Sequence, residues 1–514
     1  MAYTRPGIYV SEGPFTTTVA NSPAGAAAAF IGTAERGSTT PVLIQSWNAY
    51  KTQFGDLSAN YELGYALYHF FANGGRTAYV TRVVSGASNT AIASANFAGT
   101  ASGSSQTVFS LRATSAGAWG NSLSAVVSAG NNTGTTPTFN LVIKNGTTTV
   151  ETWSELSLNR DDSRYIESVI NNYSNYVHAY NVLYNTSASA TYAAGTAYTV
   201  TAAISASPVS LANGNNGATL AASDWATALR TLDTVEGQLA INLVGQSSAT
   251  IINNAIEYVD PTQSESARKN AFLIIDPDAT KTTANAINSL VTGYTTTSYA
   301  SVYYSMLSMS NPAVRGSAAL RDTYPGGAIA GLYQRVEAER GVGRAPAGYS
   351  YTLQNAFGTV LNFTDSDAGL LYGNNVNVLK TVPGAGVIVN GARTLVKTDI
   401  TKYIPVRRTL NYVKAQVDEI TKPYLFQNNG PRMWTSISGN VAKMLGQLWS
   451  SGALKGRNTS EAFYIICDET NNTAQTIEAG EVHVEVGVAL QTPAEFIVIN
   501  VSQFTGGNTV NETL

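Results

Sequence analysis

The pattern of apolar residues near the C-terminal end predicts two adjacent strands. Within residues 481–488 every second residue is a valine, which is the period-two pattern of a strand with one buried face. The valines on that face are Val482, Val484, Val486 and Val488. Residues 496–501 are almost continuously apolar and predict a strand covered on both faces, which includes Ile497, Val498, Ile499 and Val501. Residues 505–514 are mostly polar and are expected to have no core of their own.

The first part of the chain predicts an arm followed by a small α/β unit. Residues 1–22 contain Pro6 and Pro14 and a threonine-rich middle, so we expect an extended arm with one short strand, formed by Gly7, Ile8, Tyr9 and Val10. Apolar runs at residues 26–31 and 78–84 predict strands, and residues 47–54 and 63–71 have helical spacing. This β-α-β order predicts a small α/β sheet within residues 23–84.

The middle of the chain predicts two further units. Residues 85–210 are rich in Ala, Ser, Thr, Asn and Gly and contain short alternating runs, which indicates a solvent-exposed β-rich insertion. Residues 211–348 alternate helical patterns with buried strands at 239–244, 271–275 and 300–304, so a mostly parallel sheet is expected. Residues 349–504 include two helices with one apolar stripe each, around Leu410 and Ile437, and are expected to return to the first unit.

Composition favours association with other copies and excludes several functions. Hydrophobic residues make up 44% of the 514 residues, but charged residues only 12%, and the net charge is -3. A surface of Ser, Thr, Asn, Gly and 28 tyrosines repels its own copies weakly and suits a subunit that polymerises. The 30 basic residues are scattered, so nucleic-acid binding is not expected.

The remaining composition signals concern compartment and chemistry. Residues 1–10 lack the pattern of a signal peptide, and no apolar run approaches the roughly 18 residues of a membrane span, so we expect production in a cytoplasm without membrane insertion. The single cysteine, Cys467, is interpreted as a buried structural thiol. Glu481, His483 and Glu485 share one strand face and could hold a metal, but an exposed polar face explains them better, so neither a metal nor a cofactor is expected.

Several segments together resemble a known family. EAFYIICD at residues 461–468 and IEAGEVHVEVGVALQTPAEFIVI at residues 477–499 closely resemble the C-terminal domain of contractile tail sheath proteins. These proteins form the polymers that surround the tube of contractile phages, R-type bacteriocins and related injection machines. The blocks RPGIYVSEGP, AAFIGTAERG, PVLIQSW and FFANGGRTAYVTRV look like the N-terminal blocks of the same family, in the expected order. Further matches, which include PGGAIAGLYQRVEAERGVGRAPAG and GARTL, extend the resemblance over nearly the whole chain.

The resemblance implies a multidomain α/β and α+β protein. An inner α/β domain would form from residues 23–84 and 349–504, and a β-rich insertion (85–210) and a subtilisin-like α/β domain (211–348) would lie outside it. Arms at residues 1–22 and 505–514 would reach neighbouring subunits. We expect the arm strands, Gly7 to Val10 and the segment beginning at Phe504 and Thr505, to add to the sheet that contains the valines of residues 482–488 and the run 496–501.

The family also implies a function and partners. Copies would form hexameric rings stacked around a tail tube, with baseplate and tail terminator proteins at the ends, and would contract to drive the tube through the host envelope. The protein would lie in the virion tail after assembly in the host cytoplasm. The polar side of the helix around Leu410 is a candidate for contact with the tube, either as solvated ion pairs or as the tube-facing surface; it carries Lys414, Asp418, Glu419 and Lys422.

Two other classes of protein are alternatives to a sheath. A serine protease needs a histidine beside Ser and Asp, and none of His69, His178 and His483 lies within residues 211–348, so no catalytic residue is expected. A non-contractile surface or receptor-binding protein, whose β-rich region would contact the receptor, is the other alternative. It would not form hollow striated cylinders.

Overall fold

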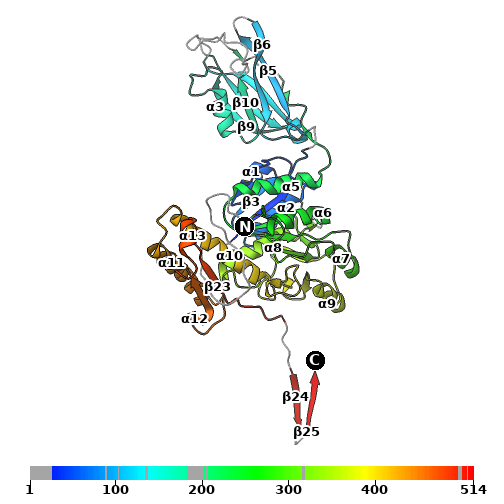
Figure 1. Cartoon of the computed structure of the whole chain (residues 1–514). Helices are drawn as coiled ribbons and strands as arrows, with labels where there is room; N and C mark the ends of the chain where they lie inside the picture. The colour runs from blue at the N-terminus through cyan, green and yellow to red at the C-terminus, as the bar shows by residue number, and fades with distance from the viewer. Residues whose placement is uncertain are drawn as a thin grey trace.

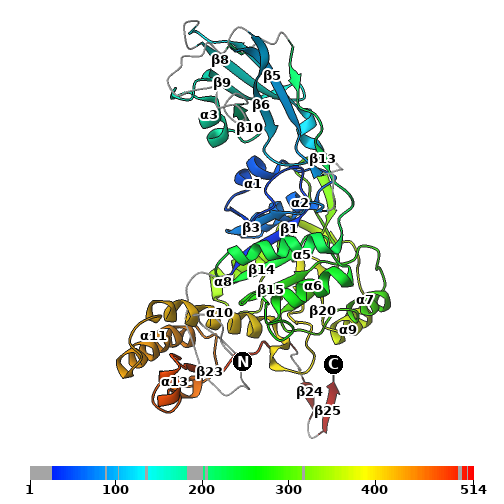
Figure 2. The same cartoon turned by 45° about the horizontal axis from the view of Figure 1, so that its top comes forward.

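The described parts of the chain form an elongated molecule (Figure 1). The computed structural model describes residues 26–86, 90–101, 104–132, 137–181, 201–202, 207–314, 319–495, 500–505 and 508–513. In these residues a β-rich insertion unit lies at one end, a central α/β unit lies below it, and a helical C-terminal unit packs beside the α/β unit. A hairpin near the C-terminus lies apart from all three (Figures 1 and 2).

A twisted mixed sheet organises the α/β unit. In the described residues its order is β2-β3-β1-β14-β15-β16-β20-β21, and all neighbours are parallel except the two edge pairs, β2 with β3 and β20 with β21. Strands β14 to β16 are buried along their whole length, which explains their continuous apolar sequences. The strand bounds are β1 (Ala27–Gly32), β2 (Val42–Ile44), β3 (Ala78–Arg82), β14 (Leu239–Leu243), β15 (Ala271–Ile275), β16 (Ala300–Tyr304), β20 (Val376–Val382) and β21 (Gly386–Asn390).

This sheet corrects the expected domain division. Residues 23–84 and 211–348 were assigned to separate domains, but β1 pairs directly with β14, from Ala27 opposite Leu239 to Ile31 opposite Leu243. Residues 376–390 join the same sheet through β20 and β21. The described N-terminal residues therefore belong to the α/β unit, and the inner domain built from both chain ends is not what the sheet shows.

Helices cover both faces of the central sheet. Helices α1 (Trp47–Phe54), α2 (Glu62–Ala72) and α8 (Gly326–Arg340) share one core with Phe30 and Phe272. Helices α5 (Ala222–Thr231), α6 (Ala249–Val259), α7 (Ala284–Val291) and α9 (Asp365–Gly373) cover the opposite face, where Ile31 and Leu273 are buried. The helix predicted at residues 47–54 is confirmed.

Helices α2 and α8 pack with almost no space between their backbones. A Cβ atom on Gly327 would lie 2.1 Å from the carbonyl oxygen of Ala66, and one on Gly331 would lie 2.4 Å from that of Phe70. This close approach is the physical reason for the two glycines four residues apart in α8.

A small antiparallel sheet continues from the carboxyl end of β16. Its central strand β17 (Leu307–Ser310) pairs with β18 (Leu320–Thr323) on one side and β19 (Ala356–Thr359) on the other. Leu307 and Met309 point into the core of the α/β unit and are fully buried.

The insertion unit has its own core between two antiparallel sheets. One sheet has the order β10-β6-β5-β11 and the other β12-β7-β8-β9 within the described residues, and Phe97, Phe109 and Phe139 stack in the core. The elements are β5 (Ser94–Ala101), β6 (Ser104–Ala113), β7 (Leu123–Ala129), β8 (Thr138–Asn145), β9 (Thr148–Ser157), α3 (Ile166–Tyr173), β10 (Val177–Asn181), β11 (Thr201–Ala202) and β12 (Val209–Ser210).

Two paired strands and two buried arginines connect the insertion unit to the α/β unit. β4 (Thr90–Ala91) and β13 (Asn215–Asn216) pair antiparallel where the chain enters and leaves the unit. The guanidinium of Arg36 donates to Thr52 O at the end of α1 and lies 4.3 Å from the ring centroid of Tyr176 in the insertion unit. Arg82 on β3 donates to Ala116 O at 2.6 Å. These contacts fix the orientation of the insertion unit on the α/β unit.

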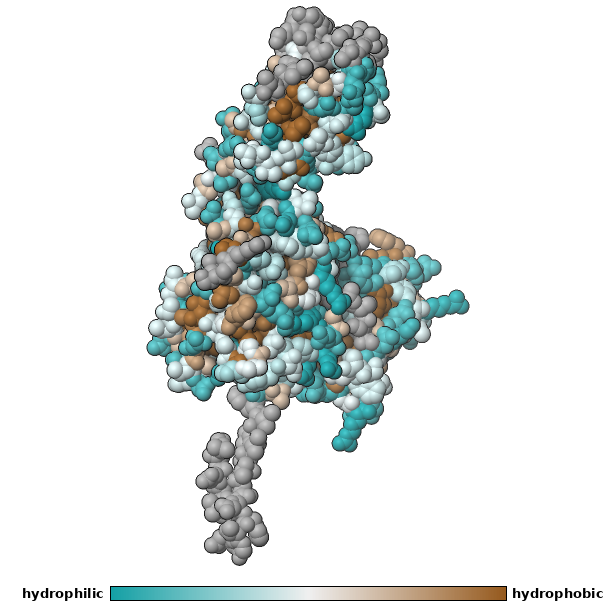
Figure 3. Space-filling model, turned by 180° about the vertical axis from the view of Figure 1, so that it is seen from behind, coloured by the Kyte–Doolittle hydropathy of each residue, from teal (hydrophilic) through white to brown (hydrophobic). Residues whose placement is uncertain are grey.

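The C-terminal unit consists of two long helices and a small sheet. Helix α10 (Ile404–Thr421) leads into α11 (Pro431–Ser450), followed by α12 (Thr459–Ala462), β22 (Phe463–Ile466), α13 (Ala474–Glu478) and β23 (Glu485–Val488). The hairpin strands are β24 (Asn500–Thr505) and β25 (Asn508–Thr513). A space-filling view shows apolar patches over the body of the molecule and the insertion unit, within a surface that is otherwise neutral or hydrophilic (Figure 3).

We expect Gly327→Ala to destabilise the α/β unit. The added methyl group cannot fit against the α2 backbone, so the helices must separate, at a cost of about 1–3 kcal/mol or more in the free energy of unfolding. Gly439→Ala in α11 is the matched control, because a Cβ there meets nothing within 4 Å. It should raise stability by about 0.5–1 kcal/mol through helix propensity. Urea unfolding of both variants measures the difference, and equal stabilities would contradict the packing described.

Candidate assembly interface

The sheet of the C-terminal unit, β22–β23, has two strands in the described residues. β22 and β23 pair antiparallel, with Phe463 opposite Val488 and Ile465 opposite Val486, and no third strand joins them in the part of the chain that the structure describes. These four side chains pack against the core of α11, which includes Ile437, Val441, Leu445 and Leu448. All of β22 is nevertheless only half-buried, so its outer edge is accessible to another chain.

The structure shortens the strand that the valine pattern predicted. Residues 481–484 are not in a strand, and β23 begins at Glu485. The side chain of Asn472 explains the difference, because it accepts from the backbone N–H of His483 at 2.7 Å and donates to the carbonyl of the same residue at 3.0 Å. Val482 and Val484 still pack against the C-terminal core, as their spacing indicated.

Several predicted arm and sheet residues lie at or beyond the described residues. Gly7, Ile8, Tyr9 and Val10 lie outside them, as do Ile497, Val498 and Ile499. Val501 lies in β24, opposite Glu512. Phe504 and Thr505, expected to begin a single arm strand, end β24 instead and pair with Thr509 and Asn508 of β25. The C-terminal arm is therefore a hairpin, and it contacts itself rather than β22 and β23 (Figures 1 and 2).

A partly buried ion pair fixes the chain just before the hairpin, and the sequence did not reveal it. Arg393 donates to both carboxylate oxygens of Glu495, at 3.0 and 2.5 Å, and its guanidinium lies 3.9 Å from the ring centroid of Tyr372 on α9. The two side chains are 15% and 11% exposed. Burial alone would raise the pKa of Glu495, but the hydrogen bonds from Arg393 and Tyr372 outweigh it and lower that pKa. This pair sets where the C-terminal arm leaves the α/β unit.

Helix α10 is buried on two sides, whereas the sequence predicted a single apolar stripe. One side packs with α11 in the C-terminal core. The other side contacts the α/β unit: Asn411 donates to Ala271 O at the start of β15, and Arg408 forms a buried ion pair with Glu337 of α8 at 2.6 Å. The Arg407 guanidinium lies over the Tyr299 ring. The adjacent arginines, Arg407 and Arg408, were the sequence signal for this second buried side, because charged residues in the buried part of a helix need partners.

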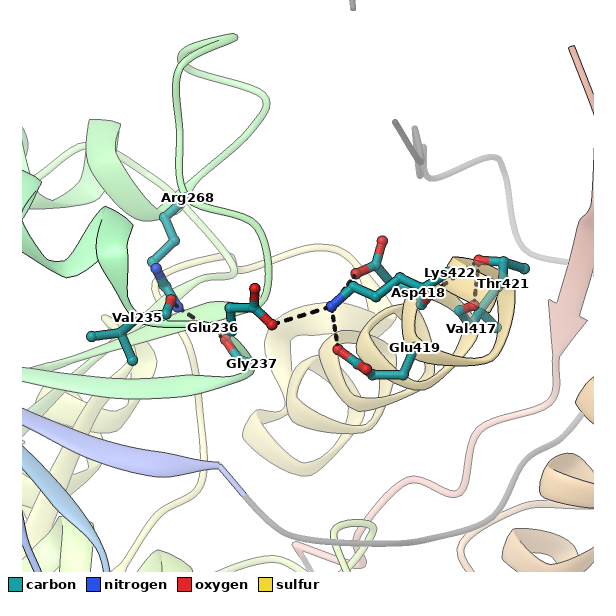
Figure 4. Close-up of polar contacts among 9 residues, drawn as sticks. All are labelled: Val235, Glu236, Gly237, Arg268, Val417, Asp418, Glu419, Thr421 and Lys422. Atoms are coloured by element: carbon teal, nitrogen blue, oxygen red, sulfur yellow. Dashed lines mark hydrogen bonds and ion pairs between the residues drawn. The ribbon is translucent and has the colours of Figure 1, made fainter. Parts of the chain in front are cut away.

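Three of the four proposed tube-facing residues, Asp418, Glu419 and Lys422, line a groove between α10 and the loop before β14 (Figure 4). The Lys422 ammonium lies 2.5 Å from Glu419, 3.8 Å from Asp418 and 3.4 Å from Glu236. Burial raises the pKa of Asp418, and the hydrogen bond to Glu419 raises the pKa of Lys422. Lys414 lies farther along the helix, 3.4 Å from the Tyr299 hydroxyl. Asp418, Glu419 and Lys422 therefore lie together, and Lys422 forms ion pairs with both of these carboxylates and with Glu236 of the same chain.

Arg268 orders the other side of this groove. Its guanidinium donates to the backbone carbonyls of Val235 and Gly237, which fixes the loop that carries Glu236 (Figure 4), and also to that of Leu232. The position of Glu236 opposite Lys422 is therefore set by the backbone of the α/β unit.

The carboxylates considered for metal binding do not converge. Glu481 lies 3.0 Å from His483 Nε2, whereas Glu485 accepts a hydrogen bond from Tyr464 at 2.6 Å. In the described ranges no group of three or more His, Cys, Asp or Glu side chains could hold a metal ion. No helix in those ranges is long and apolar enough to cross a membrane.

The α/β unit contains a histidine that comes from outside residues 211–348. His69 lies on α2, which belongs to the α/β unit, so this unit does contain a histidine. Its ring is fully buried, neither ring nitrogen has a hydrogen-bond partner among the described residues, and desolvation lowers its pKa to about 4. Asp276, at the carboxyl end of β15, instead accepts from the backbone of Gly245 and Gly326. A buried imidazole without a Ser or Asp partner is not the base of a triad.

Comparison with known proteins connects this architecture to a family. Residues 396–504, which hold α10, α11, β22 and β23, match the family model described as phage tail sheath C-terminal domain. The resemblance to contractile tail sheath proteins is confirmed. No curated protein matches the chain.

Solved structures extend the likeness of fold to the whole chain. The sheath complex of the extracellular contractile injection system PVC, in its contracted state, is similar with a TM-score of 0.58 and 19% identity over 98% of both chains. The contracted helical sheath of the anti-feeding prophage has a TM-score of 0.57 and 17% identity over 98% of this chain and 100% of its own. The sheath tail protein of Listeria innocua has a TM-score of 0.61 and 12% identity over 96% of both chains.

We expect Glu495→Ala to weaken the anchor of the C-terminal arm. Loss of a charge-assisted, partly buried pair should lower the free energy of unfolding by about 2 kcal/mol, because Arg393 keeps its charge without a carboxylate partner. The pKa of Glu495 is depressed in the folded protein, so its contribution is present above the unfolded pKa and is lost as pH falls through the folded pKa. Asp365→Ala is the control, since its ion pair with Lys380 is largely exposed. It should change stability by less than about 0.5 kcal/mol.

Urea unfolding of both variants between pH 7 and pH 3 measures these effects. The difference between wild type and Glu495→Ala should shrink as pH falls. A constant difference over that range would show that the carboxylate charge is not what stabilises the anchor.

Proposed function

We propose that the protein is a subunit of a contractile sheath that polymerises as stacked rings around a tube and shortens to drive the tube through an envelope. The observation that carries the proposal is the two-stranded sheet β22–β23, which lies in the family-matched region. The residues of β22 are half-buried, which leaves its outer edge accessible within the described residues, and the hairpin β24–β25 lies apart from the body (Figure 2). The β22–β23 sheet of one copy would accept further strands, and the β24–β25 hairpin of a neighbouring copy would supply them.

Strand addition accounts for both features. An edge strand presents unpaired N–H and C=O groups, and a neighbour's strand pairs them without a specific side-chain fit. We propose that the C-terminal arm of one copy and the strand Gly7 to Val10 of another extend the β22–β23 sheet. The anchor at Glu495 would let the arm rotate about a fixed point while its strand stays paired.

The work of contraction would come from contacts that form as subunits rotate. Each copy can bury apolar surface that is exposed before contraction, at about 25 cal/mol per Å², and a polymer sums this over all of its copies. Support for contraction and for sixfold rings comes from the similar structures, which include sheaths in contracted states and a sixfold-symmetrised baseplate of the anti-feeding prophage. We propose a tail location, with tube, baseplate and terminator proteins as partners.

We expect removal of residues 505–514 or of residues 1–20 to abolish polymerisation and leave a folded subunit. The described cores include none of these residues, so thermal unfolding of the monomer should change little, while pelletable polymer should disappear. Negative-stain electron microscopy and sedimentation measure the result. Ordered cylinders from either truncated protein would contradict the role of that arm.

Removal of the insertion unit is the matched control for the arm deletions. Ala91 pairs with Asn215, so residues 92–214 can be replaced by a two-residue turn without moving β4 or β13. This deletion removes far more of the chain than either arm deletion, yet polymerisation should persist, because the insertion unit has a separate core. Loss of polymer from this folded variant would show that the insertion unit takes part in assembly.

For the tube, we propose that the polar end of α10 faces it. Glu419 is the candidate to test, because its side chain is 55% exposed while it pairs with Lys422. Glu419→Arg should leave self-assembly intact and lower the yield of sheath on tubes several-fold through charge reversal at the contact. Asp365→Arg, at a 94% exposed site on α9, should change neither yield. Equal tube loading by the two variants would restore the interpretation of solvated ion pairs.

A further inference from the structure

The groove between α10 and the loop before β14, which we call the α10 groove, is lined by side-chain amides that lack partners. The side-chain nitrogen of Gln238 and the side-chain oxygen of Asn270 are inaccessible to solvent and have no hydrogen-bond partner among the described residues. The side-chain oxygen of Asn411, a residue that is 3% exposed, also lacks a partner there, one turn before Ala415 of the groove wall. Unpaired buried polar groups cost stability, so these three atoms favour a segment that can pair with them.

The lining of the α10 groove carries no excess charge. Its volume of about 320 Å³ is at the lower end for a ligand site. The ion pair of Lys422 with Glu236, at 3.4 Å, spans the groove (Figure 4). An uncharged occupant of small cross-section therefore fits, and a stretch of backbone supplies one N–H and one C=O per residue. The charged lining residues are the acidic Glu236, Asp418 and Glu419 and the basic Arg268, Lys269 and Lys422.

The chain enters the α/β unit beside this groove. At the start of β1 the backbone N–H of Ala27 donates to Gln238 O at 3.1 Å, and the side chain of Gln334 donates to Ala26 O at 3.1 Å. Helix α10 crosses the amino ends of β15 and β14, and β1 is the next strand of the sheet. The chain that precedes Ala26 therefore starts at the α10 groove.

The sequence of this preceding segment suits the groove. Residues 13–25 carry no charged side chain, and residues 22–25 are Ser, Pro, Ala and Gly, which are all small. The groove wall from Ala415 to Lys422 is about 10 Å long at 1.5 Å per helical residue, a length that four extended residues span. The segment is covalently attached at the groove, so its effective concentration there is high and a few hydrogen bonds can hold it. A second copy or a tube protein lacks this advantage.

We propose that the α10 groove binds residues 22–25 of its own chain in an extended conformation. Their backbone groups would pair with the side-chain amides of Gln238, Asn270 and Asn411. The contact lies within one chain, so it goes beyond the proposed sheath function and does not depend on polymerisation. It would fix where the N-terminal arm leaves the subunit, as the ion pair of Glu495 does for the C-terminal arm.

The reactivity of an introduced thiol tests whether the segment is bound. In the folded Ala24→Cys subunit the new thiol should react with a soluble disulfide reagent at least about tenfold more slowly than the new thiol of Asp365→Cys, because it reacts only when the segment leaves the groove. The Asp365 side chain is 94% exposed and serves as the reference site. The native thiol of Cys467 is buried and does not compete.

Two substitutions in the groove should release the segment. Gln238→Met removes the donor with little change in size, and Asn270→Gly removes an acceptor while it tolerates the backbone φ of +62°. Combined with Ala24→Cys, each should speed the thiol reaction several-fold, while thermal unfolding of the subunit stays cooperative. Gln447→Met, at an exposed glutamine of α11, is the matched control and should leave the rate unchanged.

A disulfide identifies the occupant. The variant with both Ala24→Cys and Gln416→Cys should form a disulfide within one chain when the dilute subunit is oxidised, because Gln416 lines the groove. Mass spectrometry of the linked peptides measures it. The pair Ala24→Cys and Asp365→Cys should form none, since Asp365 lies beside Lys380, toward the carboxyl ends of the strands.

Three results would overturn the proposal. The first is equal reaction rates for the thiols of Ala24→Cys and Asp365→Cys, with no disulfide within the chain. The second is a disulfide that joins two chains, because the groove would then hold the arm of a second copy. The third is a Gln416→Cys thiol that is protected only on sheath-loaded tubes, because the tube would then occupy the groove.

Discussion

The β22–β23 sheet leaves one edge of each strand without a strand partner among the described residues, and the assembly proposed here depends on that constraint. A two-stranded sheet is marginal by itself, and this one persists because Phe463, Ile465, Val486 and Val488 pack on the core of α11. The helix stabilises one face of the sheet but cannot satisfy its edges. The sheet is therefore stably folded in one subunit and can still pair with further strands at its edges. A polymer held by exchanged strands requires both properties.

The connections between units determine how motion at this sheet would spread. Helix α10 is held on one side by α11 and on the other by Arg408 with Glu337 and by Asn411 with Ala271, so the C-terminal and α/β units are expected to move together. Arg36 and Arg82 couple the insertion unit in the same way. The described contacts thus favour rigid units that rotate as one body.

The sequence predicted local structure well where one physical signal dominates. The buried strand at residues 271–275 and the helix at residues 47–54 are confirmed, because continuous apolar runs and helical spacing depend only on nearby residues. The pairing of β1 with β14 was missed, since periodicity shows that a strand is buried but not which strand lies beside it. The same limit applies to the candidate site. The partners of Lys422, Arg408 and Glu495 come from distant segments, and Asn472 ends the valine strand through a contact that spacing does not encode.

Cryo-electron microscopy of the assembled polymer, at a resolution that traces the backbone, tests the central claim most directly. The measurement is the origin of the strands that lie beside β22 and β23. The account predicts that the sheet gains strands whose chains belong to neighbouring subunits, with the chain beyond Glu495 crossing to another copy. A sheet that keeps two strands in the polymer, or one completed by the termini of its own subunit, would contradict it.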